Sequence, residues 1–131
     1  MTEWNKDLVL SRMTRADETL EDARILAKAG RWNACVNRPY YACFYAVSAL
    51  LVRDGLSSSK HAGVRGLFNK RYVKTGKIPK DLARIYNDLF ERRQEGDYID
   101  FVSFQESQVL PWISKAEDEM PVGNLFQHTR A

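Results

Sequence analysis

Cysteine is scarce in this 131-residue sequence, and long apolar runs are absent. The two cysteines, Cys35 and Cys43, lie in one segment that is predicted to be helical. They would be ~12 Å apart along the helix axis, which is too far for a disulfide. No apolar run approaches the ~20 residues of a membrane span, and residues 4–20 are too charged for a signal peptide. We therefore expect buried, reduced cysteines, no contact with a membrane and a cytoplasmic location.

Histidine is equally scarce, since the chain has two, His61 and His128, and neither accompanies a cluster of cysteine or aspartate. This scarcity argues against a zinc site. The glycine-rich phosphate loops GxxxxGKS/T and GxGxxG are also missing. Neither cysteine is a good candidate nucleophile, because both lie in an apolar helix with no histidine nearby in the sequence. The sequence therefore predicts no metal and no cofactor.

Acidic residues are missing from residues 55–80, although the net charge of the whole chain is only +3. The basic residues of this segment are Lys60, Arg65, Lys70, Arg71, Lys74, Lys77 and Lys80. Such a local excess of positive charge creates a face that can bind phosphate-rich partners. A solvated face that keeps the protein soluble explains the excess equally well. If the face binds, the predicted nucleic-acid contacts are Lys60, Arg65, Lys70, Arg71, Lys74 and Lys77.

Helical periodicity is abundant, with apolar residues at alternating three- and four-residue steps. Hydrophobic content of 44% and charged content of 28% are ordinary for one globular domain. We predict an all-α, up-and-down helical bundle of about five helices in residues 1–120, followed by a flexible C-terminal tail in residues 121–131. The expected helices cover residues 3–29, 32–54, 60–75, 79–95 and 103–120.

Local signals set the expected ends of these helices. Pro39 removes a backbone donor, so we expect a kink or a frayed first turn there. A serine among residues 57–59 can cap the third helix, and Gly96 should end the fourth. Residues 103–106 match a capping box that starts the fifth helix, and Pro111 should bend that helix.

Arg38 is the most informative single residue, because its neighbours on both sides are almost wholly apolar. A guanidinium in such surroundings is costly unless it is paired or faces a partner. On a helix, Arg38 shares one face with Tyr41, Tyr45 and Ser48. This polar stripe is suited to gripping an anion or a second subunit. The alternative is that Arg38 pairs with a carboxylate such as Asp97 and locks the fold.

Residues 92–98 form a second polar run with guanidinium, carboxylate and phenol groups. Arg92 and Arg93 complement the dipole at the end of the fourth helix, worth ~0.3–1 kcal/mol each if exposed, which explains one or both of them. A functional interpretation requires one of the two to converge with Arg38. His61 either caps the basic helix or contacts a ligand as an acid–base group near the arginines.

Residues 37–44, NRPYYACF, resemble the N-R-x-Y-Y-A-x-F signature of HEPN domains, small helical bundles of bacteria and archaea. Three further segments resemble parts of the same family in the same order, namely residues 60–64, 68–78 and 93–98. The resemblance extends over residues 23–119, which is most of the chain. It implies a HEPN-like bundle that forms a homodimer, with its sites near the subunit interface.

The resemblance also implies a partner and a chemistry. Many HEPN proteins pair with a minimal nucleotidyltransferase, and many such pairs act as toxin and antitoxin. In those pairs the HEPN member is a metal-independent ribonuclease with an arginine, four to six further residues and a histidine. Histidine moves protons while the RNA 2′-hydroxyl attacks, and arginine stabilises the phosphorane. In some relatives the partner adds nucleotides to a tyrosine just after this motif, and Tyr98 lies at a similar place here.

The chain departs from the ribonuclease motif, because no arginine precedes His61 or His128 at that spacing. Asp97 lies where the histidine is expected, and a carboxylate is a poor acid at neutral pH. We predict first a dimeric module that binds RNA or a nucleotide and acts with a minimal nucleotidyltransferase. One alternative is an active ribonuclease with His61, Arg92 or Arg93 as catalytic candidates, and another is a structural dimer without a ligand. The predicted ligand contacts are Arg38, Tyr41, Arg93, Asp97 and Tyr98.

Overall fold

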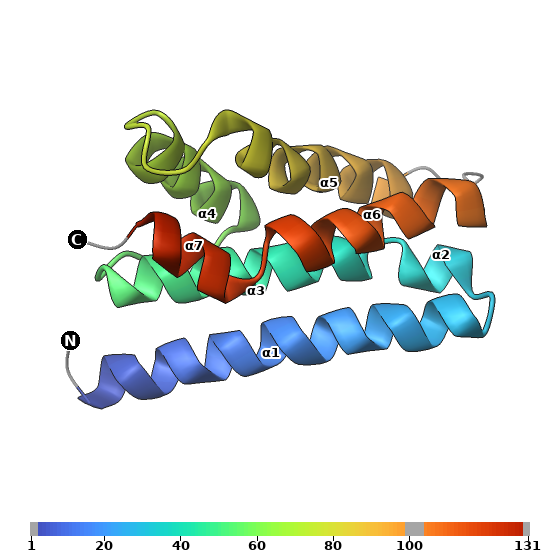
Figure 1. Cartoon of the computed structure of the whole chain (residues 1–131), viewed down its shortest axis with the longest axis horizontal. Coiled ribbons are helices and arrows are strands. Elements are labelled where there is room, and N and C mark those ends of the chain that lie inside the picture. Colours follow the sequence, from blue (N-terminus) through green and yellow to red (C-terminus); the bar gives the residue numbers. More distant parts are fainter. Residues whose placement is uncertain (1–2, 99–103, 130–131) are drawn as a thin grey trace.

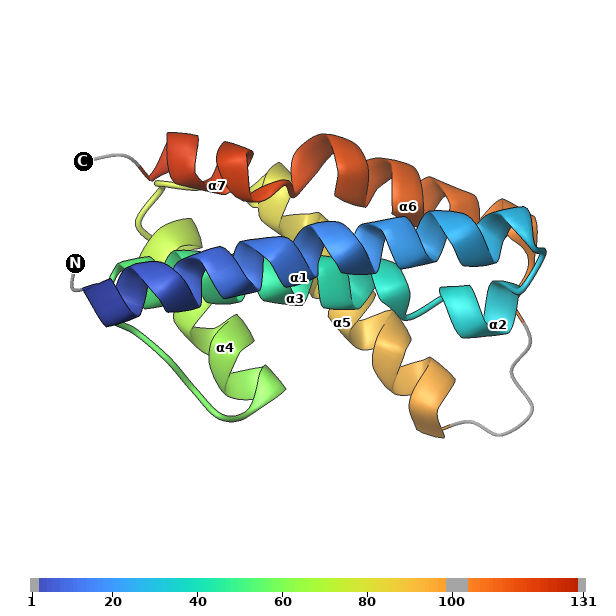
Figure 2. The ribbon, with the colours of Figure 1, turned by 90° about the horizontal axis from the view of Figure 1, so that it is seen from below.

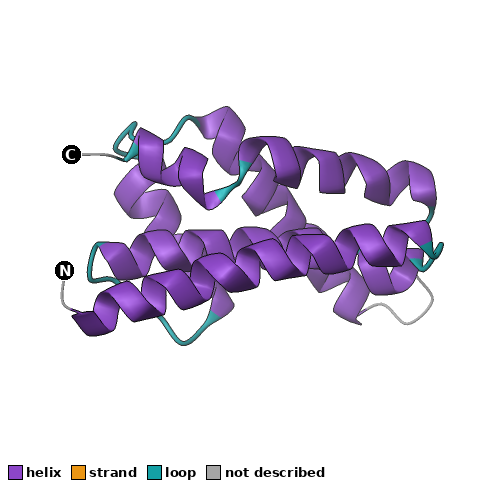
Figure 3. Ribbon diagram, turned by 60° about the horizontal axis from the view of Figure 1, so that its bottom comes forward, coloured by secondary structure: helices purple, strands orange, loops and turns teal. Residues whose placement is uncertain are grey.

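The computed structural model describes residues 3–98 and 104–129, and of residues 3–4, 93–98 and 122 it describes the backbone alone. Within these ranges every regular element is a helix (Figure 3). The predicted all-α fold is therefore confirmed. None of the helices in these ranges is both long and apolar enough to cross a bilayer.

The helices follow one another along the chain in an up-and-down bundle. They are α1 (Glu3–Lys28), α2 (Trp32–Cys35), α3 (Arg38–Arg53), α4 (His61–Phe68), the π-helical turn η1 (Asn69–Val73), α5 (Lys80–Tyr98), α6 (Glu106–Glu119) and α7 (Val122–His128). Figure 1 shows α1 and α3 side by side along the long axis, with α5 beyond α3. In Figure 2 the same bundle is seen from the side of α1, and α6 and α7 lie end to end along it.

Helix α3 is the centre of the bundle, because α1, α4, α5, α6 and α7 all contact it. Its residues Tyr40, Val47 and Leu50 have no exposed surface. A helix that is apolar on nearly all sides is expected to occupy this central position. None of the large apolar side chains of α3 is exposed. The large apolar side chains that stay exposed in the described ranges are Leu10, Ile25 and Leu110.

The predicted continuous helix over residues 32–54 is in fact two helices. The short helix α2 ends at Cys35, and α3 begins at Arg38 with Pro39 in its first turn. Proline has no N–H to donate, and it disfavours helical geometry in the residue before it. The break therefore falls just before Pro39, and it places Arg38 at the very start of α3.

The third helix differs from its prediction at both ends. The N-cap of α4 is Lys60 rather than a serine, and Ser58 Oγ instead accepts a hydrogen bond of 3.3 Å from the Lys60 backbone nitrogen. At its other end α4 passes into η1, which holds five residues. The side-chain amides of Asn69 and Asn87 donate to each other at 3.0 and 3.1 Å. These two bonds fix η1 against α5.

Two further helix ends differ from expectation. Helix α5 continues through Gly96, because one glycine inside a helix costs only about 1 kcal/mol and does not by itself end it. Helix α6 begins after Gln105, whose backbone nitrogen donates to Gln108 Oε1 at 2.9 Å. The sequence placed this cap at Ser103, which lies outside the described residues. Pro111 lies inside α6, as expected.

The C-terminal segment also differs, because a flexible tail was expected over residues 121–131. Instead α7 packs against α3, and its Leu125 is fully buried in the main core. The guanidinium carbon of Arg53 lies 4.8 Å from the centre of the Phe126 ring, and Arg53 Nη2 donates to the Thr129 carbonyl at 3.4 Å. A short helix with few apolar residues has little periodicity, so the sequence pattern alone did not show it.

Candidate functional site

Arg38 lies half-buried at the first position of α3. Its Nε donates to Asn37 Oδ1 at 3.1 Å, and its guanidinium carbon lies 5.1 Å from the centre of the Tyr41 ring. Stacking on an aromatic face stabilises a guanidinium without neutralising its charge. Arg38 forms no ion pair with any carboxylate that the structure describes. The alternative that Arg38 locks the fold through Asp97 is not tested, because the side chain of Asp97 lies outside the described residues.

The predicted polar stripe lines a hollow of about 350 Å³ between α1 and α3. This hollow, called here the Arg38 hollow, is lined by Arg15, Glu18, Thr19, Asp22, Arg38, Tyr41 and Tyr45. Arg15 reaches over the Tyr45 ring with its guanidinium carbon 5.2 Å from the ring centre. Ser48, expected on the same stripe, lines a smaller hollow with Arg12 instead. Two arginines and two carboxylates face the Arg38 hollow, so its charges balance.

Helix α4 brings His61 to the aromatic side of the same site. The imidazole stacks on the Phe44 ring at 4.3 Å between centres and 11° between planes. Its Nδ1 lies 2.8 Å from the Tyr40 hydroxyl, and its ring meets the Tyr41 ring edge-on at 5.7 Å. His61 and Arg38 therefore both contact Tyr41. The structure brings these three predicted site residues together.

Buried aromatic rings pack on the core side of His61. Tyr40 is fully buried and stacks at 6.0 Å on the equally buried Tyr86. Burial raises the pKa of the Tyr86 hydroxyl, and the neighbouring Tyr40 and Cys43 raise it further. Tyr86 therefore stays neutral at physiological pH. In the described part of the chain, the neutral rings of Tyr40, Tyr41 and Phe44 therefore lie against the His61 imidazole.

The second polar run lies at the end of α5. Arg92 is exposed there. The backbone of Arg93, Asp97 and Tyr98 is helical, but their side chains are outside the described residues. Their convergence with Arg38 therefore stays a prediction.

The predicted basic face is divided in the structure. Arg65 is anchored on α5, because its Nη1 lies 2.9 Å from Glu91 Oε1 and its guanidinium carbon lies 4.0 Å from the centre of the Phe90 ring. Lys60 is exposed at the start of α4. The remaining predicted contacts surround η1 and the turn that follows it, and all are exposed: Lys70, Arg71, Lys74 and Lys77.

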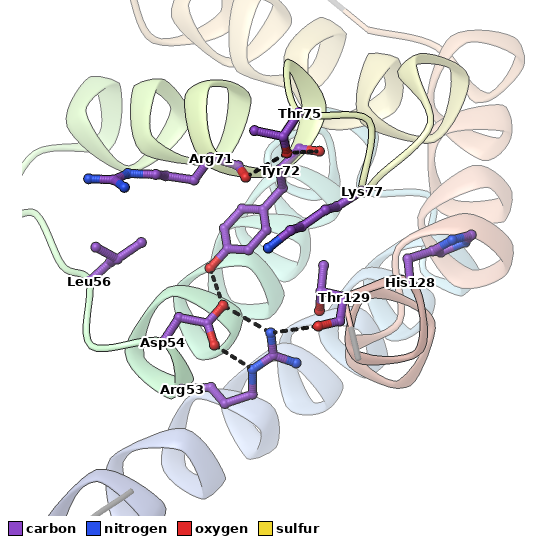
Figure 4. Close-up of a pocket in the computed structure, with 9 residues that line it drawn as sticks. All are labelled: Arg53, Asp54, Leu56, Arg71, Tyr72, Thr75, Lys77, His128 and Thr129. Atoms are coloured by element: carbon purple, nitrogen blue, oxygen red, sulfur yellow. Dashed lines mark hydrogen bonds and ion pairs between the residues drawn. The ribbon is translucent and has the colours of Figure 1, made fainter. Parts of the chain in front are cut away.

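Arg71 and Lys77 line a second hollow of about 550 Å³ at the opposite end of α3 (Figure 4). This hollow, called here the Arg71–Lys77 pocket, is lined by Arg53, Asp54, Leu56, Arg71, Tyr72, Thr75, Lys77, His128 and Thr129. No sequence pattern indicated that Arg53 and His128 lie beside these cations. Arg53 and His128 are far apart along the chain, and the sequence analysis placed His128 in a flexible tail.

Both cysteines are free and buried, as predicted. Burial raises the pKa of Cys43 to about 12. Burial also raises the pKa of Cys35, while the positive charge of Arg38 partly opposes this shift. Thiols that stay protonated are poor nucleophiles and poor metal ligands. No group of three or more potential metal ligands occurs among the described histidine, cysteine and acidic residues.

The fold and the site define a class of protein: a small all-α bundle with an arginine, tyrosines and a histidine gathered at the start of its central helix. The sequence model of the HEPN domain matches residues 9–119. The chain therefore belongs to the HEPN domain family.

Relatives of similar length carry two kinds of description. A UPF0332 protein of Thermotoga maritima is 54% identical over 103 residues, covering 79% of this chain and 78% of the relative. A UPF0332 protein of Gloeobacter violaceus is 37% identical over 113 residues, covering 84% and 86%. A protein of Methanocaldococcus jannaschii described as a candidate toxin is 34% identical over 97 residues, covering 72% of each chain. The resemblance to HEPN proteins is thus confirmed, and some relatives are described as toxin-like.

Proposed function

We propose that this HEPN protein is the toxin-like member of a two-protein pair, and that it binds RNA or a nucleotide as a homodimer beside a minimal nucleotidyltransferase. The description of the Methanocaldococcus relative as a candidate toxin supports the first half of this proposal. The arrangement of Arg38, Tyr41 and His61 supports the second half.

The observation that carries the proposal is the contact of Arg38 and His61 with one tyrosine ring. Tyr41 and Tyr45 are half-buried beside the Arg38 hollow, so parts of both side chains face solvent. Aromatic rings beside an arginine are a common platform for single-stranded nucleic acid, because bases stack on rings while guanidinium groups meet phosphates. The balanced charge of the hollow suits a ligand with an uncharged base better than a bare anion.

The homodimer is proposed on a different surface from the one that the sequence suggested. Helix α1 packs on α3, yet Leu10 and Ile25 on α1 are 59% and 56% exposed. The outer surface of α1 could pack against the same helix of a second copy, which would cover both side chains. We expect a two-fold dimer at micromolar concentration in sedimentation. A species that stays monomeric at ~100 times that concentration would contradict a dimer.

The test of the ligand site uses a fluorescent single-stranded RNA and polarisation measurements. We expect Arg38→Ala to weaken binding about ten-fold, the size of one lost charge-assisted contact. Arg84→Ala is the matched control, because Arg84 is 69% exposed and, among the described residues, pairs with Asp81 alone, at 3.6 Å. Equal binding by both variants would contradict a ligand site at Arg38.

A second function, a metal-independent ribonuclease, is favoured by the closeness of His61 and Arg38 to one ring. In such a reaction His61 moves a proton and Arg38, Arg92 or Arg93 stabilises the phosphorane. RNA cleavage in the presence of EDTA that is lost in His61→Ala would support it. Intact RNA after incubation with the wild-type protein at any concentration would rule it out.

A further inference from the structure

The Arg71–Lys77 pocket is formed by three segments that are distant in the sequence. They are the C-terminal end of α3 with the residues after it, η1 with its following turn, and the end of α7 (Figure 4). Arg38 and Arg53 are the first and last residues of α3, roughly 22 Å apart along its axis. The pocket is therefore a separate site from the Arg38 hollow.

Asp54 is the one acidic residue among the described residues that line the pocket, and Arg53 already neutralises its charge. Arg53 Nε donates to Asp54 Oδ1 and Arg53 Nη2 donates to Asp54 Oδ2, both at 2.9 Å. The Tyr72 hydroxyl donates to Asp54 Oδ2 at 2.5 Å. Burial alone would raise the pKa of Asp54, but these bonds and the charges of Arg53 and Lys77 lower it below its ordinary value. Asp54 thus stays ionised and paired with Arg53.

Arg71 and Lys77 are not part of the Arg53–Asp54 pair. Neither side chain has an ion pair or a hydrogen bond to any described residue, and both are exposed. Figure 4 shows Lys77 reaching toward the Asp54–Arg53 pair, with Arg71 on the side of Leu56. The pocket therefore has two uncompensated positive charges, whereas the charges of the Arg38 hollow balance.

Hydrogen bonds and a tight turn fix the backbone that carries these two cations. Thr75 Oγ1 donates to the Arg71 carbonyl at 2.8 Å. The chain then turns at Gly76, whose φ of 82° lies in the left-handed region that favours glycine. Ile78 is fully buried and its backbone nitrogen donates to the Tyr72 carbonyl at 2.9 Å, so Lys77 is anchored on both sides. A fixed backbone means that a ligand has only the two side chains to order, which lowers the cost of binding.

We propose that the Arg71–Lys77 pocket binds a phosphate group, carried either by a free nucleotide or by an RNA strand. Guanidinium and ammonium groups are the usual protein partners of phosphate, the first through two parallel hydrogen bonds and the second as a point charge. This inference deepens the proposed function by assigning the phosphate contact, and it rests on that function only for the class of ligand. It also gives a role to Arg71 and Lys77 that Lys70 and Lys74 on the same segment do not share.

The experiment compares two double variants with the same change in charge. R71Q/K77Q removes the two cations of the pocket that lie outside the Arg53–Asp54 pair, and K70Q/K74Q removes two exposed cations of the same segment that do not line it. Calorimetric titration with AMP and polarisation with a short RNA measure the two sources of phosphate. Adenosine is the probe without phosphate. Thermal melts confirm that both variants fold.

We expect R71Q/K77Q to weaken binding of AMP, of RNA or of both about ten-fold or more, and K70Q/K74Q to change it less than about two-fold. An effect on AMP identifies a nucleotide site, and an effect on RNA alone identifies a backbone contact. Equal losses of affinity in both variants, or adenosine binding as tightly as AMP, would contradict phosphate binding in the pocket. If R71Q/K77Q binds normally while Arg38→Ala does not, the pocket is wrong and the proposed function stands. The reverse result would retain the pocket and reject the Arg38 site.

Discussion

The two ends of helix α3 each present an arginine, and the two arginines differ in what surrounds them. Arg38 at the start lies on a tyrosine ring and bonds to a neighbouring amide. Arg53 at the end is closed on Asp54 through two hydrogen bonds, and it complements the helix dipole there. Yet the hollow beside Arg38 is neutral, whereas the pocket beside Arg53 is positive. Whether an arginine has a direct ion-pair partner therefore does not predict the net charge of the hollow beside it.

This difference has a simple cause. Glu18 and Asp22 on α1 face Arg38 across the hollow and cancel the charge of Arg38 and Arg15 at longer range. At the other end Arg53 cancels Asp54 at short range, which leaves the cations of η1 and its turn unopposed. We infer that the first end suits bases and aromatic contacts and the second suits phosphate.

The largest expected effect comes from breaking the helix that connects both ends. Leu50 lies in the fully buried part of α3. Leu50→Ala removes buried apolar surface and leaves a cavity, so we expect about 2–5 kcal/mol less free energy of unfolding. Chemical denaturation measures this loss. A loss below about 1 kcal/mol would contradict the central position of α3 in the core.

Removing Asp54 should lower stability and raise phosphate affinity together. Asp54→Ala deprives Arg53 and Tyr72 of their acceptor, which we expect to cost about 1–2 kcal/mol because partial exposure screens the pair. The same change frees the positive charge of Arg53 for a ligand. Chemical denaturation and AMP titration on one preparation measure the expected loss of stability and the expected gain of affinity. Weaker AMP binding with lower stability would contradict the charge account of this end.

Removing Arg38 should have a much smaller effect on stability. Arg38→Ala loses one hydrogen bond to Asn37 and one stacking contact on Tyr41, worth about 0.5–1 kcal/mol at a partly exposed site. A buried ion pair would instead cost about 3–5 kcal/mol when one partner is removed. The free energy of unfolding therefore separates a ligand contact from a structural lock. A loss of several kcal/mol in the free energy of unfolding would instead support the alternative that Arg38 locks the fold through an ion pair.

The smallest of these effects is expected from acid pH, which should weaken the contribution of the Asp54–Arg53 pair to stability. The pKa of Asp54 in the folded state lies below its ordinary value of 3.8, so its contribution to stability is present above that value. The contribution is lost as pH falls through the lowered pKa. We expect the stability difference between wild type and Asp54→Asn to be constant at neutral pH and to shrink below about pH 3.8. A difference that grows on acidification would contradict the pairing with Arg53.

Sequence periodicity predicted the helices of the core well, because α1 and α3 carry long amphipathic or apolar patterns. At Pro39 it predicted a kink or a frayed turn, whereas the chain there forms two separate helices. It missed the helix α7, because so short a segment carries little pattern. The contact between Arg38 and Tyr41 was predictable, because both lie on one helix face and in one family motif. The Arg71–Lys77 pocket was not, because its charge depends on which groups meet in space. Arg53 beside Asp54 reads as an ordinary surface pair until Tyr72 and Lys77 are placed beside it.

The most direct test of the difference between the two ends is an NMR titration of the isotope-labelled protein with AMP. We expect the amide signals of residues 71–77 and of Asp54 to shift with one affinity, because the phosphate enters the positive pocket. Signals near Arg38 and Tyr41 should shift separately, with a different affinity or only with RNA. Shifts confined to the Arg38 end, or no shifts at residues 71–77, would contradict the account.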